Sequence, residues 1–115
     1  RPEGFLVLSG NDDETFPLMK AGADGVISVA SNIAPEPVAK LAHAMMEGKV
    51  EKAAGLHEML SPLFRNCFVE SNPIPAKAAL AAMGMMCNEL RLPLVASQQK
   101  TYDLMVETVK DLGLL

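Results

Sequence analysis

The sequence predicts an α/β fold in which two short parallel strands lead into a series of helices. The apolar run Phe5-Leu6-Val7-Leu8 meets Ser9-Gly10, which is typical of a buried strand. A second apolar segment, Gly25 to Val29, follows after one helix length, and every later segment has helical spacing of its apolar residues. Two strands cannot form an α/β sheet alone. We therefore expect the chain to be the end of something larger.

The composition of the chain excludes several classes of partner. The 115 residues are 50% apolar and carry a net charge of −4, with acids and bases interleaved rather than grouped in blocks. This pattern argues against a nucleic-acid surface or a polybasic membrane tag. No signal-like segment is present, and no apolar stretch approaches the roughly 18 residues of a membrane span. We expect a soluble, cytoplasmic protein that binds neither nucleic acid nor membrane.

The residues that could hold a metal or cofactor do not form a known ligand pattern. Cys67 and Cys87 lie far apart without C-x-x-C or a His at ligand spacing, so we expect two reduced, core-type thiols; a disulfide or zinc site is the less favoured alternative. His43 and His57 lack H-E-x-x-H spacing and are expected to be solvated or at the edge of the core. The glycines lack the G-x-G-x-x-G pattern of dinucleotide sites. We expect no metal and no cofactor.

A helix is expected between the two strands. Asp12, Asp13 and Thr15 gather at its start, where free backbone N–H groups favour acids and hydroxyl caps. Together with Glu14 these acids could bind a cation or act as bases, but capping is the favoured interpretation. The glycines of segment 21–25 suit a left-handed C-terminal turn before the second strand. The resulting βαβ unit requires parallel strands.

The remaining sequence predicts four helices separated by proline-rich connectors. The first begins at Pro35 or Pro37 and ends at Gly48, and the second runs from Lys49 to about Asn66. The third covers about 76–86, and Ser97 is expected to cap the last helix. The residues expected to face the core are Val38, Leu41, Ala42, Met45, Ala53, Leu56, Leu60, Leu63, Phe64, Tyr102, Met105, Val109 and Leu112.

Lys77 and the methionines each have a structural and a functional interpretation. Lys77 lies in an apolar helical stretch and could be a desolvated Schiff-base amine. The favoured interpretation is a lysine whose stem covers the helix and whose ammonium reaches water. The eight methionines are expected to fill gaps between helices rather than bind a partner.

The strand ends are the best candidate site in the sequence. Ser9-Gly10-Asn11 and Ser28-Val29-Ala30 follow two parallel strands, and α/β barrels place their active sites at such carboxyl ends. Gly10 permits close approach of the backbone to a ligand, and Ile27 can offer its carbonyl oxygen. Taken alone, these residues support a role in lining the wall of a substrate pocket.

Four segments in this order carry a resemblance to a known family: Val7–Asp12, Gly22–Val29 with Asn32, Phe68–Lys77, and Leu90–Leu94. Together they closely resemble the C-terminal portion of the dihydrodipicolinate synthase family. The glycine-rich strand alone would fit the wider pyruvate-dependent class I aldolase superfamily, including N-acetylneuraminate lyase. The Asn-Pro-Ile-Pro-x-Lys segment and the Leu-Arg-Leu-Pro connector favour the synthase.

The resemblance implies a fragment of a (β/α)8 TIM barrel followed by a helical domain. Residues 1–48 would supply the last two β/α units, and residues 49–115 the C-terminal helical domain. The family is a homotetrameric lyase of lysine and diaminopimelate biosynthesis that condenses pyruvate with aspartate semialdehyde through a lysine Schiff base. That lysine and the assisting tyrosine and threonine belong to earlier strands, so the resemblance implies no catalytic residue in this chain. It implies substrate-binding roles for Ile27, through its main-chain oxygen, and for Gly10.

Two hypotheses of different classes remain open from the sequence. The chain is either part of such a lyase, requiring the remainder of the barrel, or an independent non-catalytic helical module. Uncovered strand edges favour the first hypothesis. A different pyruvate-dependent aldolase, similar to N-acetylneuraminate lyase, is the alternative within the superfamily.

Overall fold

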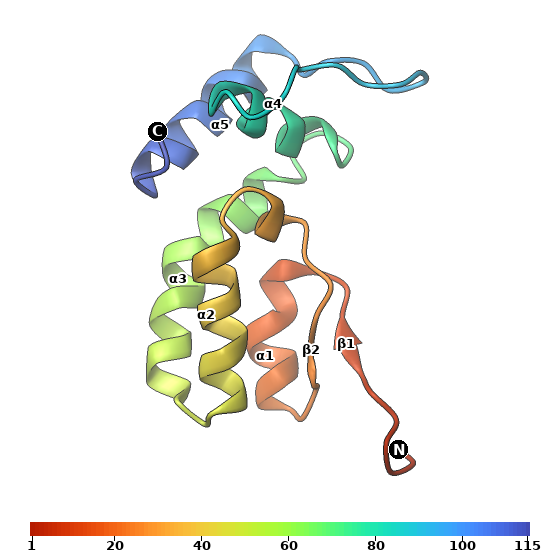
Figure 1. Cartoon of the computed structure of the whole chain (residues 1–115), viewed down its shortest axis with the longest axis vertical. Coiled ribbons are helices and arrows are strands. Elements are labelled where there is room, and N and C mark those ends of the chain that lie inside the picture. The colour runs from red at the N-terminus through yellow and green to blue at the C-terminus, as the bar shows by residue number, and fades with distance from the viewer.

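The computed structural model describes all 115 residues as two short strands flanked by helices (Figure 1). β1 and β2 lie on one side of the molecule, α1, α2 and α3 form the layer beside them, and α4 and α5 lie beyond the carboxyl ends of the strands. The elements in order are β1 (Leu8–Ser9), η1 (Asp12–Glu14), α1 (Thr15–Lys20), β2 (Gly25–Val26), η2 (Ala30–Asn32), α2 (Pro35–Met46), α3 (Val50–Asn66), α4 (Ile74–Ala82) and α5 (Gln99–Asp111).

The βαβ unit predicted from the sequence is confirmed, although its strands are shorter than expected. β1 and β2 pair in parallel, with Leu8 opposite Gly25 and Ser9 opposite Val26. The sequence predicted strands over 5–8 and 25–29, and each strand has two residues. Each strand has one neighbour only.

Asp24 extends the strand pair beyond β1 and β2. Its backbone N–H donates to the Val7 carbonyl at 2.8 Å, and its carboxylate accepts the Val7 N–H at 2.8 Å. The Arg1 guanidinium donates to the same carboxylate at 2.5 Å. The hydrogen bond from Val7, and then that from Arg1, hold the pKa of Asp24 below its usual value. One aspartate therefore secures the amino end of the sheet.

The helices α2 and α3 form the centre of the core. They lie side by side, joined by a turn in which Gly48 adopts a φ of +73°, a conformation that favours glycine. α3 continues through Pro62. The expected core faces are confirmed in most positions: Val38, Leu41, Ala53, Leu60, Leu63 and Phe64 are buried. Ala42, Met45 and Leu56 are only partly buried, and Ala44 is buried although it was not predicted.

The last two helices differ from the prediction at their ends. α4 stops at Ala82, before the expected end at Met86, because Gly84 turns the chain away with a φ of +75°. Ser97 does not cap α5: its hydroxyl is buried without a hydrogen-bond partner. The N-cap is Gln98, whose backbone N–H donates to the Glu70 carboxylate at 3.1 Å.

The two cysteines have different surroundings. Cys67 is buried after the end of α3, as predicted, and its pKa is raised to about 12 by burial and then by the charge of Asp12. Cys87 is exposed, so the prediction of a core position for it is wrong. It lies in the long connection between α4 and α5, which packs few side chains inward.

The apolar segment that leads into β1 is exposed, in contrast to the prediction of a buried strand. Phe5, Leu6, Val7 and Leu8 all present their side chains to solvent, and Ile27 is 70% exposed. The helices cover one face of the strand pair, and nothing in the chain covers the other (Figure 1). None of the helices is both long and apolar enough to cross a membrane.

We expect the isolated chain to bind a hydrophobic dye and to self-associate, because this patch of neighbouring apolar side chains has no partner. Fluorescence titration and mass in solution measure both effects. The triple variant Phe5→Ser, Leu6→Ser, Ile27→Ser should bind less dye than the parent chain. A monomeric parent with a sharp melt and no dye binding would show that the patch needs no partner.

Candidate substrate-binding site at the strand ends

The two residues predicted to line a substrate lie side by side at the carboxyl ends of β1 and β2. The Ile27 N–H donates to the Ser9 carbonyl at 2.9 Å, which continues the parallel ladder by one bond. Gly10 follows Ser9, and a Cβ atom placed on it would meet no other atom within 4 Å. The structure therefore brings Gly10 and Ile27 together with open space beside them.

The carbonyl oxygen of Ile27 is available to a ligand. No N–H or hydroxyl group of the chain donates to it, whereas the Ser9 carbonyl opposite is occupied by the Ile27 N–H. A carbonyl oxygen without a donor carries a partial negative charge into the open space at the strand end. It can accept a hydrogen bond there or stabilise positive charge on a bound molecule.

Asp12 holds this strand end in place. The residue is 2% exposed, and its carboxylate accepts hydrogen bonds from the Ser28 hydroxyl, the Val29 N–H at 3.0 Å and the Ala30 N–H at 2.9 Å. None of the ion pairs of the chain involves it. Three donors, rather than a cation, compensate for the burial of the charge.

The role of Asp12 corrects the sequence interpretation. Asp12 was expected to cap the helix that it begins, but its side chain caps η2, which follows β2. Thr15 is buried and makes no capping bond; the residue at the cap position of α1 is Glu14. Asp13 is exposed. The sequence shows an acid at the start of one helix and serines at the start of another. That the acid binds the start of the other helix could be predicted only with knowledge of the strand register.

Two serines complete the network around Asp12. The Ser28 hydroxyl donates to Asp12 and accepts the Ser31 N–H at 2.9 Å, while the Ser31 hydroxyl donates to the Ser28 carbonyl at 3.1 Å. At the other strand, the Ser9 hydroxyl donates to the Asn11 carbonyl at 2.7 Å. The turns after both strands are thereby fixed by side-chain to backbone bonds.

A hollow of about 260 Å³ lies next to the strand ends, between the turn after β2 and α4. Its polar lining includes Ser28, Asn32, Asn72 and Lys77. Lys77 is half-buried, and its ammonium donates to the Glu89 carbonyl at 2.9 Å. This bond gives the lysine a structural role in fixing the connection between α4 and α5.

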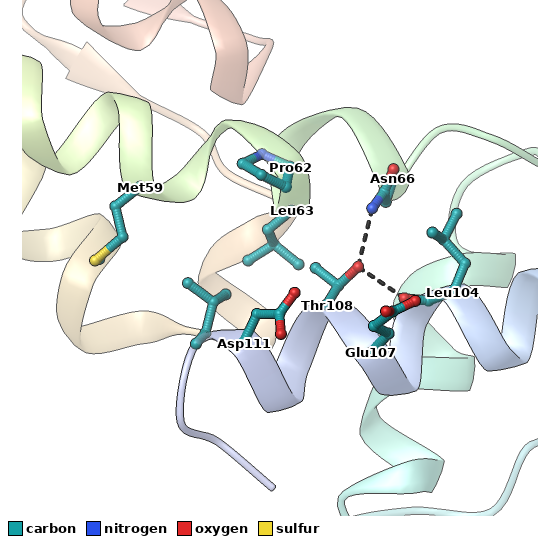
Figure 2. Close-up of a pocket in the computed structure, with 9 residues that line it drawn as sticks. Met59, Pro62, Leu63, Asn66, Leu104, Glu107, Thr108 and Asp111 are labelled. Carbon is teal, nitrogen blue, oxygen red and sulfur yellow. Dashed lines mark hydrogen bonds between the residues drawn. The ribbon is translucent and has the colours of Figure 1, made fainter.

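Another hollow, of about 190 Å³, lies between α3 and α5 (Figure 2). The Asn66 amide donates to the Thr108 hydroxyl at 2.9 Å, and that hydroxyl donates to the Leu104 carbonyl at 2.7 Å. Glu107 and Asp111 stand at its rim. The hollow contains neither Gly10 nor Ile27, and its hydrogen bonds secure α5 against α3.

The histidines do not form a site. His43 is exposed, and the His57 ring lies between Phe16 and Phe64 with ring centroids 5.5 and 6.0 Å away. This agrees with the expectation that the histidines are solvated or at the edge of the core. No three His, Cys, Asp or Glu side chains gather closely enough to hold a metal ion.

Comparison with known proteins identifies the family. A sequence model of the Dihydrodipicolinate synthetase family matches residues 1–112. The chain belongs to this family. A curated relative, the 4-hydroxy-tetrahydrodipicolinate synthase of Thermotoga neapolitana, is 52% identical over 111 residues, which are 96% of this chain and 38% of the relative. The chain thus spans well under half the length of the curated relatives that it matches.

Solved structures of the family have the same local fold. Dihydrodipicolinate synthase from Thermotoga maritima superposes with a TM-score of 0.95 at 52% identity, covering 96% of this chain and 38% of that one. The chloride-inhibited enzyme from Acinetobacter baumannii, solved in complex with pyruvate, gives a TM-score of 0.93 at 35% identity with the same coverage.

Substitution of Asp12 tests its role in holding the strand end. We expect Asp12→Asn to lower the free energy of unfolding by about 2 kcal/mol or more, because an amide group would replace one acceptor oxygen in a buried network. Asp13→Asn is the matched control and should stay within about 0.5 kcal/mol of the parent, because its side chain is exposed.

Denaturant unfolding of the protein that contains this segment measures the difference. Amide hydrogen exchange at Val29 and Ala30 should rise in Asp12→Asn only. Equal stability of the two variants would contradict the role assigned to the Asp12 carboxylate.

Proposed function

We propose that this chain is the C-terminal part of a lyase that condenses pyruvate with aspartate semialdehyde through a lysine Schiff base, in lysine and diaminopimelate biosynthesis. The observation that carries the proposal is the family match over residues 1–112, together with 52% identity to a synthase. Residues 1–48 would form the last two β/α units of a TIM barrel, and residues 49–115 the helical domain. The lysine would come from the remainder of the barrel.

Ile27 and Gly10 are the substrate-binding residues of this proposal. When a lysine amine adds to the ketone of pyruvate and water leaves, an imine forms, and its nitrogen carries a positive charge once it has taken up a proton. The free carbonyl oxygen of Ile27 is suited to stabilise that charge, because it is fixed in direction before substrate arrives. Gly10 leaves room for the substrate beside it. Support comes from the relative that was solved in complex with pyruvate.

The exposed strand face supports the proposed barrel. α1 covers one side of the strand pair, as helices do in parallel sheets, and α2 packs against α1. The other side exposes apolar residues, and both strands have a free edge. Further strands of a closed barrel would pair with these edges and bury that face. A cytoplasmic homotetramer is the expectation that the family resemblance adds.

The alternatives have less support. An independent helical module would be expected to cover its own apolar surface, and this chain leaves Phe5 to Leu8 exposed. Relatives at 44% to 52% identity are named 4-hydroxy-tetrahydrodipicolinate synthase, which favours that activity over one similar to N-acetylneuraminate lyase.

Borohydride trapping tests the proposed function. The complete protein incubated with pyruvate and reduced with borohydride should gain one pyruvate adduct per chain, on a lysine outside this segment. The isolated segment should gain none, since the proposal assigns the Schiff-base lysine to another strand. Intact mass and peptide mapping measure both results. A stoichiometric adduct on Lys77 or any other lysine of the isolated segment would overturn the assignment.

Substitutions at Ile27 separate the roles of its backbone and its side chain. In the complete protein, Ile27→Val should cost at most about 1.5 kcal/mol of stability and leave turnover nearly unchanged, because the carbonyl is retained. Ile27→Pro should abolish most activity. Proline removes the N–H that donates to Ser9 and changes the direction of the carbonyl.

Pyruvate saturation kinetics and thermal midpoints measure the effects of both variants. A large rise in the KM for pyruvate in Ile27→Val, with unchanged melting, would show that the side chain itself recognises the substrate.

A further inference from the structure

The peptide group between Ile27 and Ser28 has no hydrogen bond of its own within the chain. No donor of the chain bonds the Ile27 carbonyl, and the Ser28 N–H donates to no acceptor of the chain. A peptide group is planar, so its carbonyl and its N–H turn together when a neighbouring dihedral angle changes. The direction of the Ile27 carbonyl is therefore set by the hydrogen bonds on either side of this peptide group.

Hydrogen bonds fix the chain on both sides of the Ile27–Ser28 peptide group. Before it, the Ile27 N–H donates to the Ser9 carbonyl at 2.9 Å. After it, three successive residues, 28–30, all donate to the Asp12 carboxylate. The first bond belongs to the ladder between β1 and β2 and does not involve Asp12. The three bonds after the peptide group depend on a single side chain.

The two carboxylate oxygens of Asp12 divide these three donors between them. One oxygen accepts the N–H groups of Val29 and Ala30, at 3.0 and 2.9 Å, and the other accepts the Ser28 hydroxyl. Hydrogen bonds to a charged acceptor are roughly twice as strong as those between neutral groups. Asp12 is 2% exposed, so water does not compete for its oxygens. Neutralising this side chain should therefore weaken the hold on residues 28–30 without abolishing it.

We propose that Asp12 is a positioning residue of the lyase: it acts through residues 28–30 to hold the Ile27 carbonyl in the direction that meets bound pyruvate. Asp12 touches no substrate itself, because its carboxylate is buried under the turn that it binds. The inference rests on the proposed function, which assigns the Ile27 carbonyl to the charge of the imine. A carbonyl that is already aligned needs no reorganisation when that charge develops, so loss of alignment should slow the reaction.

Pyruvate saturation kinetics of the complete protein, measured well below its melting midpoint, test the proposal. Asp12→Asn should lower kcat/KM for pyruvate by about tenfold or more, because a small misplacement of an interacting group has an effect of this size. The asparagine keeps the size of the side chain, and its oxygen can still accept two N–H groups. Asp13→Asn, at an exposed neighbouring position, should keep kcat/KM within about twofold of the parent.

A variant with a defect in the distant core separates positioning from a general loss of stability. Val109 is fully buried in α5, and Val109→Ala should lower the melting midpoint without lowering kcat/KM for pyruvate. Equal losses of kcat/KM in Val109→Ala and Asp12→Asn would overturn the proposal. An Asp12→Asn protein that melts earlier but keeps the kcat/KM of the parent would show that the carboxylate has a structural role only.

Ser28 offers a milder pair of variants, which keeps the proposal testable if Asp12→Asn does not fold. Ser28→Ala removes one of the three donors and should lower kcat/KM for pyruvate by about threefold or more. Ser28→Thr keeps the hydroxyl and should retain most of the activity that the alanine variant loses. The added methyl group has room, because Ser28 lines the hollow beside α4. Equal kcat/KM in the alanine and threonine variants would contradict the proposal.

The double variant tests whether the two side chains act as one unit. In the Asp12→Asn background, Ser28→Ala should lower kcat/KM by less than about twofold more, because the bond between the two side chains is already weakened. Fully additive losses would mean that Ser28 does not act through Asp12, which would count against the proposed path to Ile27.

Borohydride trapping of pyruvate distinguishes failure of this inference from failure of the proposed function. The expected result is an adduct in both the parent and Asp12→Asn, formed about tenfold more slowly in the variant. A parent protein that forms no adduct would refute the proposed function. Adducts that form at the same rate in the two proteins would refute only the positioning role of Asp12.

Discussion

The arrangement of the strand ends depends on one buried carboxylate. Asp12 leaves water without a cationic partner, which is costly unless its oxygens are fully bonded. The three donors that satisfy it all come from the turn after β2. The hydrogen-bond network therefore joins two segments that lie next to each other in space but are separated in the sequence by α1. Ile27 lies immediately before that turn, so Asp12 helps to fix the direction of its carbonyl, together with the bond from the Ile27 N–H to the Ser9 carbonyl.

The strand pair is short enough to need such support at both ends. Each strand contributes two residues, and a ladder of this length has few backbone bonds. Asp24 binds Val7 at the amino end, and Asp12 binds the turn at the carboxyl end. Two aspartates thus bracket the sheet. One is half-buried and paired with Arg1, while the other is buried and bonded only to neutral donors.

Much of the helical architecture could be predicted from the sequence, because spacing and turn residues act locally. The apolar stripe of α3, including Leu60 and Phe64, was correct, and so was the parallel βαβ unit. Predictions failed where a distant group decides the outcome. Ser97 does not cap α5, and the Glu70 carboxylate, from another segment, binds the Gln98 N–H at the start of that helix. Asp12 was assigned to its own helix because its real partners lie across the sheet.

The candidate site could be predicted only in part. The strand-end positions of Gly10 and Ile27 follow from the βαβ pattern, and the structure places the two residues side by side. The free carbonyl of Ile27 was not visible in the sequence, since backbone groups carry no side-chain signature. The prediction that Phe5 to Leu8 are buried was also wrong. An apolar run indicates that a side chain needs cover, but not which part of a polypeptide supplies it.

The tight turn between α2 and α3 has a consequence for how this polypeptide acquires its shape. The two helices contact each other across a connection of three residues, 47–49, so bringing them together costs little loop entropy. Contacts that are close in sequence form quickly, while parallel strands must wait for distant partners. The α2–α3 pair is therefore suited to act as the folding nucleus, against which the strand pair and later helices assemble.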